Sequence, residues 1–467
     1  MNPTIKILDQ LPTEPSQNLS DKIQVATQQK NDHIIVLDDD PTGTQTVQNF
    51  PVLTTWSVEV LQKEMEIGSS IFYILTNSRA LPQAEADELA KEIGRNIKTV
   101  SKRLHKKCMV ISRSDSTLRG HYPSEVESLK TALGQIDTIN ILIPAFFEGG
   151  RYTINDIHYV KQDEQLIPAA QTPYAQDKSF GYQHSDLKDW VEEKTEGKVK
   201  SSEVISFSIE ELRTKSIELL VEKLNQCPPN STCIVNAADY IDLEVFALAL
   251  MSSKVQVICR TAASFVAAIA GTHSRDLLQK EDLIEPENQQ NGGLIVVGSY
   301  VPKTTQQLSH LQANTNINSI ELDVQKILEA AQNNSTSTLL QIYATQVNKT
   351  FQSGSDLVVY TSRKLIATDT QAQNLNIGKT ISSFLTNLVS QLEVRPKYLI
   401  AKGGITSSDV ATESLQVKRA MVKGQVLPGV PVWSLGAESK FPDLSYIIFP
   451  GNVGEEDAIT KVVQLLN

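Results

Sequence analysis

The chain has 467 residues, 40% hydrophobic and 21% charged, which is a globular composition and too long for one ordinary core. The net charge of −11 argues against the broad basic face that non-specific nucleic-acid binding needs, but allows a local basic cleft for a small anion. No window reaches the length of a membrane span, and residues 1–30 lack a signal-peptide core. The cysteines, at 108, 227, 233 and 259, have neither metal-ligand nor redox spacing, so we expect a reducing cytoplasm.

The first predicted strand precedes an unusual acidic cluster. Residues 34–37 form an apolar run typical of a buried parallel strand, three aspartates follow at 38–40, and Pro-Thr-Gly at 41–43 requires a turn. An acidic turn with one capping Asp explains one or two of these carboxylates. Three adjacent carboxylates repel one another unless a metal, a proton or a ligand offsets their charge. We therefore expect a functional site at this strand end.

Three further predicted strands also end in polar residues. Their apolar runs are 70–75, 108–111 and 140–143, and residues 82–104 have helical periodicity. Strands that alternate with helices indicate a parallel sheet, so all four polar clusters should lie at one edge of that sheet. The converging side chains are Asp39, Asp40, Thr42, Ser78, Arg79, Asp115, Ser116, Thr117, Arg119 and Arg151.

These groups together resemble a pocket for a small polyhydroxylated acid. Arginines recognise carboxylates in a planar, bidentate way, and aspartates and hydroxyls suit sugar hydroxyls. Each arginine alone is more often a surface or salt-bridge residue, and its place after a strand is what favours binding. His158 could touch the site or be structural. A helix follows, for which Ser185 is the expected N-cap, and Asp239 is expected to be a cap or turn residue.

A polar stretch separates two predicted domains. Residues 278–293 are charged and rich in Gln and Asn, which makes them the best linker candidate. We therefore expect two α/β domains that face each other across a cleft, a common location for ligands. The expected division is a lead-in 1–30, a first domain 31–277, a linker 278–293 and a second domain 294–467.

Glycine turns follow the predicted strands of the second domain. They stand at Gly298-Ser299, Lys402-Gly403-Gly404-Ile405-Thr406 and Pro450-Gly451-Asn452. A strand, paired glycines and a helix N-terminus suit an anion, because free N–H groups and the helix dipole both favour negative charge. The spacing matches neither a P-loop nor a dinucleotide fingerprint, and a plain helix-entry turn explains a single Gly-Gly. Three such strand ends in one domain favour a nucleotide site.

The ordered set of motifs resembles the four-carbon acid sugar kinase family along nearly the whole chain. The family's Asp-Asp-x-Thr-Gly motif is here Asp39-Asp40-Pro41-Thr42-Gly43, and its Asp-Ser-Thr-Leu-Arg-Gly motif is 115–120. Its Pro-Ala-Phe segment and the following Gly-Arg correspond to 144–146 and 150–151. The C-terminal matches are Gly298-Ser299, Gly403-Gly404, Pro428-Gly429-Val430-Pro431 and Gly451-Asn452-Val453-Gly454.

The resemblance implies an N-terminal substrate-binding domain, a C-terminal ATP-binding domain and an active site in the cleft between them. It implies that ATP, with Mg²⁺, phosphorylates a hydroxyl of an acid sugar such as a threonate, an erythronate or a 3-oxo-tetronate. The expected substrate-binding residues are Thr42, Gly43, Ser78, Arg79, Asp115, Ser116, Arg119, Arg151 and His158. The expected nucleotide-binding residues are Ser299, Lys402, Gly403, Gly404, Ile405, Thr406, Gly451 and Asn452.

Two departures from the family pattern concern these sites. Many members have Ala-Asp-Asp-Phe-Thr-Gly-Ala where this chain has residues 38–44, which indicates a subgroup with an altered pocket. Many members also have Glu at the position of Ile405, whose apolar side chain removes one polar contact near the nucleotide. Because phosphoryl transfer needs a carboxylate that aligns the attacking hydroxyl, we expect Asp39 or Asp40 to be the base and Asp115 to hold substrate hydroxyls.

Two other functions are compatible with parts of the sequence. Asp38-x-Asp40-x-Thr42 after a strand matches the nucleophile loop of haloacid-dehalogenase-type phosphatases, with Asp38 as nucleophile and Asp40 as acid/base. A non-catalytic sugar-acid binding protein would explain the arginines but not the glycine turns. The sequence identifies neither the acid sugar, the metal ligands nor the oligomeric state, for which a homodimer is the commonest default.

Overall fold

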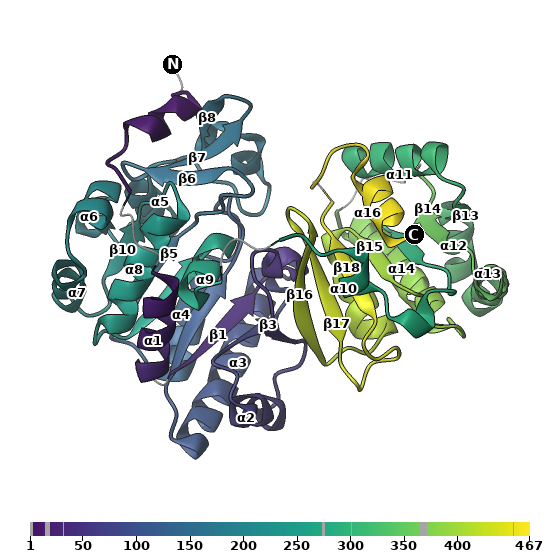
Figure 1. Ribbon diagram of the computed structural model, residues 1–467, viewed down its shortest axis with the longest axis horizontal. Helices are drawn as coiled ribbons and strands as arrows, with labels where there is room; N and C mark the ends of the chain where they lie inside the picture. The colour runs from purple at the N-terminus through teal and green to yellow at the C-terminus, as the bar shows by residue number, and fades with distance from the viewer. Residues whose placement is uncertain are drawn as a thin grey trace. The chain divides into compact units, whose positions relative to one another are not determined.

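The computed structural model describes residues 3–14, 19–30, 32–272, 276–299, 301–363, 371–451 and 453–467. The chain divides into two compact units, unit 1 (Met1–Arg275) and unit 2 (Asp276–Asn467). Each unit is an α/β structure with a largely parallel sheet and helices packed against it, which confirms the predicted fold class (Figure 1).

The strands of the main sheet in unit 1 run in the order β2-β3-β1-β4-β11-β5-β10-β9, and all neighbouring pairs are parallel. Asp38, the last residue of β1, pairs with Leu75 of β3 and Arg113 of β4, so these strands end at the same level. The polar segments that follow them therefore meet at one edge, as predicted. The strands are β1 (His33–Asp38), β2 (Pro51–Leu53), β3 (Ile71–Leu75), β4 (Cys108–Arg113), β5 (Ile139–Ile143), β9 (Ile205–Phe207), β10 (Thr232–Val235) and β11 (Val257–Thr261).

Both faces of this sheet are covered. Ile35 and Leu37 of β1 join a core with α2, α3 and α4, while Ile34 and Val36 point to the opposite face and are equally buried. A second group of helices is centred on α8, which contacts α1, α7 and α9, and α1 also contacts α9. The helices of unit 1 are α1 (Ser20–Lys30), α2 (Val58–Ile67), α3 (Gln83–Leu104), α4 (Ser124–Leu133), α5 (Leu187–Lys194), α6 (Ile209–Thr214), α7 (Ile217–Asn225), α8 (Tyr240–Ser252) and α9 (Ala263–Ala270).

One predicted helix cap is right and one is wrong. Asp239 caps α8, its side chain accepting a hydrogen bond from the backbone N–H of Ile241. Asp186, not Ser185, caps α5, because the Asp186 carboxylate accepts bonds from two backbone N–H groups of the first turn. The Ser185 hydroxyl instead accepts a hydrogen bond from the backbone N–H of Ala170.

A small antiparallel sheet of unit 1 was not predicted. It consists of β6 (Arg151–Ile154), β7 (Ile157–Gln162) and β8 (Gln165–Pro168). The turn between β6 and β7 has two left-handed residues, Asn155 and Asp156, as tight hairpins require. This sheet carries Arg151 and His158, so it contributes side chains to the region of the predicted site.

The sheet of unit 2 has the order β13-β14-β12-β15-β18-β17-β16. Its pairs are parallel from β13 to β18, and β17 is antiparallel to both of its neighbours. Val297 pairs with Lys402, and Lys402 with Phe449, so the glycine turns after β12, β15 and β18 lie at one level. The strands are β12 (Leu294–Val297), β13 (Asn318–Leu322), β14 (Leu357–Thr361), β15 (Leu399–Lys402), β16 (Arg419–Leu427), β17 (Val430–Leu435) and β18 (Ser445–Phe449).

Helices cover both faces of the unit 2 sheet as well. The neighbouring helices α11 and α16 pack on one face (Figure 1), and α13 and α14 on the other. Part of the predicted linker, Leu278, Leu283 and Ile284, packs into the first of these cores. The helices are α10 (Lys280–Leu283), α11 (Pro302–Asn314), α12 (Val324–Gln332), α13 (Thr336–Gln352), α14 (Gln371–Ser390), α15 (Gly404–Asp409) and α16 (Ala458–Leu466).

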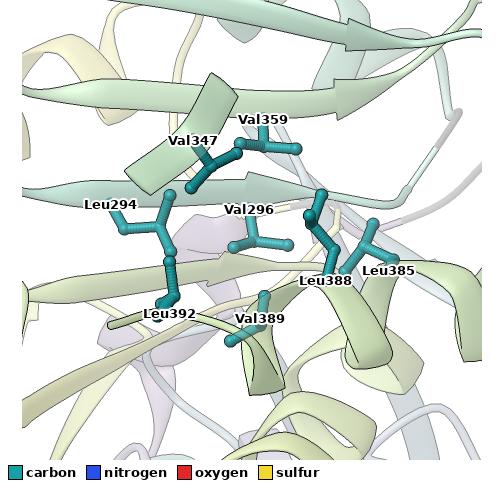
Figure 2. A pocket seen from close by; sticks show the side chains of 8 residues that line it. All are labelled: Leu294, Val296, Val347, Val359, Leu385, Leu388, Val389 and Leu392. Carbon is teal, nitrogen blue, oxygen red and sulfur yellow. The ribbon is translucent and has the colours of Figure 1, made fainter. Parts of the chain in front are cut away.

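A small cavity in unit 2 lies between the sheet and the helices α13 and α14. Figure 2 shows that aliphatic side chains alone line it, including Val296 and Val359 from the sheet and Leu388 from α14. Since no polar group faces it, this cavity cannot orient a polar ligand, and we regard it as a packing gap in the core.

Candidate functional site

Asp38 is enclosed at the end of β1. Its side chain is 2% exposed, and its Oδ1 lies 3.1 Å from Nη1 of Arg113. Burial raises the pKa of Asp38 to about 7, despite the opposing effect of the Arg113 guanidinium. A Cβ at Gly43 would collide with this carboxylate, so the glycine makes room for Asp38. The Asp38 carboxylate and the backbone of Gly43 thus pack against each other inside the turn that follows β1.

Arg79 joins three carboxylates at the strand ends. It lies in the short 3₁₀ helix Ser78–Ala80, and its guanidinium is 2.5 Å from Asp40 Oδ2, 3.3 Å from Asp115 Oδ1 and 3.8 Å from Asp39 Oδ1. Burial alone would raise the pKa of Asp40, but Arg79 and the hydrogen bonds from Thr42 outweigh it and lower that pKa. Asp40 is therefore ionised at neutral pH and fixed in place.

One carboxylate oxygen of Asp39 has no hydrogen-bond partner among the described residues. Its Oδ2 accepts a hydrogen bond from the Ser114 hydroxyl. Its Oδ1 is buried and has no hydrogen-bond partner among the described residues, and the guanidiniums of Arg79 and Arg113 lie at 3.8 and 3.9 Å. A buried oxygen without a donor is unfavourable, so this atom points to a ligand that donates a hydrogen bond.

Asp115 and Arg119 form a second ion pair in the same region. Arg119 Nε is 2.9 Å from Asp115 Oδ2, and Arg119 Nη1 is 3.7 Å from Asp177 Oδ2. Burial would raise the pKa of Asp115, but Arg79 and Arg119 together hold it far below its ordinary value. The Thr117 hydroxyl also donates to Asp115. Both partners, Asp115 and Arg119, line a small cavity, together with Leu118, Leu142, Pro144, Trp190, Arg260 and Thr261.

Arg151 differs from the other arginines of this region. Among the described residues, no carboxylate lies within ion-pairing distance of it, and its buried Nε has no hydrogen-bond partner. Its guanidinium stands 5.7 Å from the ring centroid of Tyr174 and donates to the Tyr174 hydroxyl at 3.5 Å. Arg119 stands 5.1 Å from the same ring, so Tyr174 holds both guanidiniums in one region.

His158 is a neutral, structural histidine. Its side chain is fully buried, with Nε2 2.7 Å from the carbonyl oxygen of Ser116 and Nδ1 3.0 Å from the Thr153 hydroxyl. Burial lowers the pKa of His158 to about 4. The ring therefore fixes the backbone at Ser116 and has no nitrogen left for a ligand.

The analysis of the sequence missed a buried network behind the site. Arg260 Nη1 lies 3.3 Å from Glu125 Oε2, and the Ser78 hydroxyl donates to Glu125 Oε1 at 2.7 Å. Ser78 therefore faces this network. Gly120, with φ of +121°, leaves room for the Arg260 guanidinium. Arg260 lies next to the last residue of β11 (Val257–Thr261), so the rule that polar residues at strand ends form the site could have identified it.

The glycine turns of unit 2 lie close together around Ser299. A Cβ at Gly403 would lie 3.0 Å from Ser299 Cβ, and one at Gly451 3.6 Å from Ser299 Oγ. A Cβ at Gly298 would collide with the Thr406 hydroxyl. Gly403 has φ of +114°, which favours glycine. Gly404 begins α15, Ile405 is 64% exposed, and Asn452 lies outside the described residues.

Two cations border these turns without a carboxylate within ion-pairing distance among the described residues. Lys402 is fully buried; its Nζ donates to the Pro450 carbonyl at 2.6 Å and lies 4.2 Å from the Phe449 ring centroid. Burial, assisted by the charge of Lys303, lowers the pKa of Lys402 to about 7. Arg363, which the sequence analysis missed although it follows β14, donates to the Ser299 carbonyl at 2.7 Å. The surroundings of the turns are therefore suited to an anion.

The described residues contain no group of three or more His, Cys, Asp or Glu side chains that could hold a metal ion. Within the same ranges no helix is long and apolar enough to cross a membrane.

Comparisons with known proteins agree with the division of the chain. A sugar-binding N-terminal domain family matches residues 34–269, and a nucleotide-binding C-terminal domain family matches residues 294–459. No curated protein matches the sequence. A Haemophilus influenzae protein, HI1011, of the family DUF1537, is 18% identical, with a TM-score of 0.63 over 93% of this chain and 100% of that one.

A Salmonella typhimurium LT2 protein, provisionally named a tRNA synthase, is 16% identical, with a TM-score of 0.68 over 92% of this chain and 98% of its own. At these identities the two structures show a shared fold. The two domain matches together cover most of the sequence, in the order that the motifs predict. The chain therefore belongs to the four-carbon acid sugar kinase family, whose members join a sugar-binding N-terminal domain to a nucleotide-binding C-terminal domain.

Proposed function

We propose that the protein transfers a phosphoryl group from ATP to a hydroxyl of a four-carbon acid sugar such as a threonate, an erythronate or a 3-oxo-tetronate. The observation that carries the proposal is the pairing of two different strand-end sites in one chain of this family. Unit 1 offers a fixed carboxylate–arginine cluster. Unit 2 offers glycine turns bordered by Lys402 and Arg363, which have no carboxylate within ion-pairing distance among the described residues. The cytoplasmic location and the homodimer stay predictions.

Arg151 is the group proposed to bind the substrate carboxylate. Arg79 and Arg119 already meet carboxylates of the protein, whereas Arg151 has no such partner among the described residues. A carboxylate beside Arg151 would satisfy its buried donor and form charge-assisted hydrogen bonds. Arg79 and Arg119 then act mainly by holding Asp40 and Asp115 in place for the sugar hydroxyls.

Asp40 is the proposed base. Its side chain is 23% exposed, compared with 3% for Asp39, so a substrate hydroxyl can reach it more easily. Arg79 and Thr42 fix its orientation. Phosphoryl transfer has a loose transition state in which the proton leaves late, so an ionised carboxylate that aligns the hydroxyl serves even with a lowered pKa. The spare Oδ1 of Asp39 is suited to a second sugar hydroxyl.

In unit 2, the backbone at Gly403, Gly404 and Thr406, with Ser299 and Gly451, is proposed to approach the phosphates of ATP. Lys402 and Arg363 would offset their charge. Bound Mg²⁺ would neutralise charge on the phosphates. Because Mg²⁺ is usually bound through substrate phosphates and keeps several of its waters, it would arrive here with the nucleotide.

The two rival functions are less well supported. A phosphatase of the haloacid-dehalogenase type needs an accessible nucleophile, but Asp38 is buried and paired with Arg113. A sugar-acid binding protein without catalysis would leave the glycine turns and their cations unexplained.

The proposal is tested by incubating the full chain with ATP, Mg²⁺ and a panel of threonates, erythronates and 3-oxo-tetronates while ADP release is followed. The corresponding neutral tetritols and a generic phosphate ester serve as comparisons. We expect ADP release with one or a few acids and little with the tetritols. Hydrolysis of the ester without ATP turnover would favour the phosphatase, and ligand binding without turnover would favour the binding protein.

A further inference from the structure

Two cysteines that are six positions apart lie side by side in unit 1. Cys233 is in β10, Cys227 follows α7, and their Sγ atoms are 3.8 Å apart. Both are free thiols. The turn between them contains Pro228-Pro229 and is held by a hydrogen bond from Asn230 N–H to the Asp137 carbonyl. Two prolines restrict the backbone, so the thiols are held near each other.

The two thiols have different surroundings. Cys227 is half-buried and Cys233 is fully buried. The hydrogen bond between the two thiols lowers the pKa of Cys227, an effect that the nearby Lys223 ammonium reinforces, and it raises the pKa of Cys233. Cys227 is therefore the more nucleophilic and accessible member of the pair.

The remaining cysteines, Cys108 and Cys259, have neither a lowered thiol pKa nor, among the described residues, a neighbouring thiol. Burial raises the pKa of Cys108 and of Cys259 to about 12, and no other thiol is placed beside either one in the described residues. A thiol with a raised pKa is mostly protonated at neutral pH and reacts slowly with oxidants. Oxidation should therefore be selective for the pair.

We propose that Cys227 and Cys233 form an oxidation-sensitive dithiol that hydrogen peroxide converts into an intrachain disulfide. The Cys227 thiolate attacks the peroxide oxygen, the O–O bond breaks, and Cys227 becomes a sulfenic acid as hydroxide leaves and takes up a proton. Cys233 sulfur then attacks the sulfenic sulfur and releases a second water. The two thiols lose two electrons together, and the peroxide is reduced to two waters.

This site is separate from the proposed substrate site. Cys233 lies in the first half of β10, whereas the carboxylate–arginine cluster follows the carboxyl ends of the parallel strands β1, β3 and β4. Failure of the proposed kinase activity would therefore leave the dithiol untouched, and the reverse also holds.

The test treats the folded full chain with hydrogen peroxide, blocks the remaining thiols under denaturing conditions, and maps the peptides by mass spectrometry. We expect loss of two hydrogen atoms, two of the four thiols left for alkylation, and one peptide pair linked through Cys227 and Cys233. Dithiothreitol should reverse the change. Over-oxidation of Cys227 without a disulfide, a disulfide between chains, or earlier oxidation of Cys108 would overturn the proposal.

A variant isolates the sulfenic step. In Cys233→Ala the sulfenic acid at Cys227 should persist and be trapped by dimedone, whereas the wild-type protein should give little adduct. Cys259→Ala, which changes another buried strand cysteine, is the matched control and should still form the disulfide. Equal dimedone labelling of the wild type and Cys233→Ala would contradict the resolving role of Cys233. If Cys233→Ala does not fold, the peptide map of the wild type decides alone.

Discussion

The carboxyl ends of the parallel strands are chemically opposite in the two units. In unit 1 they carry carboxylates and arginines that largely neutralise one another, and Arg79 alone meets three aspartates. In unit 2 they carry glycines and hydroxyls, with Lys402 and Arg363 left without a carboxylate partner in the described part of the chain. A neutralised cluster with few free groups suits a small hydroxylated ligand, whereas uncompensated cations suit a polyanion.

We infer that the residues beyond the strands determine which ligand each unit binds, since both sheets have parallel strands and flanking helices. In unit 1, the Oδ1 of Asp39 and the Nε of Arg151 are both buried without a hydrogen-bond partner among the described residues. In unit 2 the groups proposed to meet the ligand are backbone groups at tight turns. Substitutions that alter one edge should therefore affect one ligand.

The largest effect is expected at Asp40. Asp40→Asn keeps the shape but removes the charge that aligns the attacking hydroxyl, so kcat should fall by about 10²–10⁴-fold with little change in the KM of the acid. Steady-state ADP release measures both constants. Asp163→Asn, in an exposed turn with a φ of 52° that Asn also adopts, is the matched control. A folded Asp40→Asn variant with normal turnover would show that the base lies elsewhere.

A glycine variant tests whether the nucleotide binds at the glycine turns of unit 2. In Gly404→Val the added side chain should block the approach of phosphate to the backbone and raise the nucleotide Kd by about 10–100-fold. Calorimetric titration with a non-hydrolysable ATP analogue measures this change. Gly378→Ala, at a helical glycine with open space around it, should bind the analogue like the wild type. Unchanged affinity in Gly404→Val would remove this turn from the nucleotide site.

A variant of Arg151 tests whether the acid binds at the strand ends of unit 1. Arg151→Met removes hydrogen bonds to a charged group, each worth about 1.5–3 kcal/mol, so the KM of the acid should rise by about 10–100-fold while that of ATP stays constant. The exposed Arg103→Met, whose guanidinium contacts Gln62, is the control. A rise in both KM values would instead indicate a structural role for Arg151.

The smallest effect is a pH dependence. The pKa of Lys402 is about 7 in the folded protein, compared with its ordinary value of 10.5. Between pH 7 and pH 10.5 the folded state therefore binds fewer protons than the unfolded state, so unfolding becomes less favourable as the pH rises through this range. A bound phosphate favours the charged lysine, so nucleotide affinity should fall by at most about tenfold per pH unit from pH 7.5 to 9. Lys402→Met should flatten this profile, and an equal slope in both proteins would exclude Lys402 as its cause.

Much of the fold could be predicted because buried parallel strands are continuous apolar runs. The runs at 34–37, 70–75, 108–111 and 140–143 all became strands of one parallel sheet, and their polar ends converge. The sheet β6–β8 was missed because its short strands are not continuous apolar runs. The error at Ser185 has a local cause, since a neighbouring Asp competes for the same cap.

The site could be predicted only as a set of residues. Which arginine is neutralised depends on tertiary distances, so Arg79 and Arg151 look equivalent in the sequence but not in the structure. Arg113 is the last residue of β4 and Arg363 follows β14, but nothing in their spacing marks them as site residues. The pair Cys227 and Cys233 has no motif spacing, and only the turn between α7 and β10 brings the two thiols together.

Crossed titrations of two variants test whether the strand ends of unit 1 bind the acid while those of unit 2 bind the nucleotide. The Kd of a non-hydrolysable ATP analogue and that of the acid preferred by the wild type are measured in Arg151→Met and in Gly404→Val. We predict that Arg151→Met weakens only the acid and that Gly404→Val weakens only the nucleotide analogue. Equal weakening of both ligands in either folded variant would contradict the account.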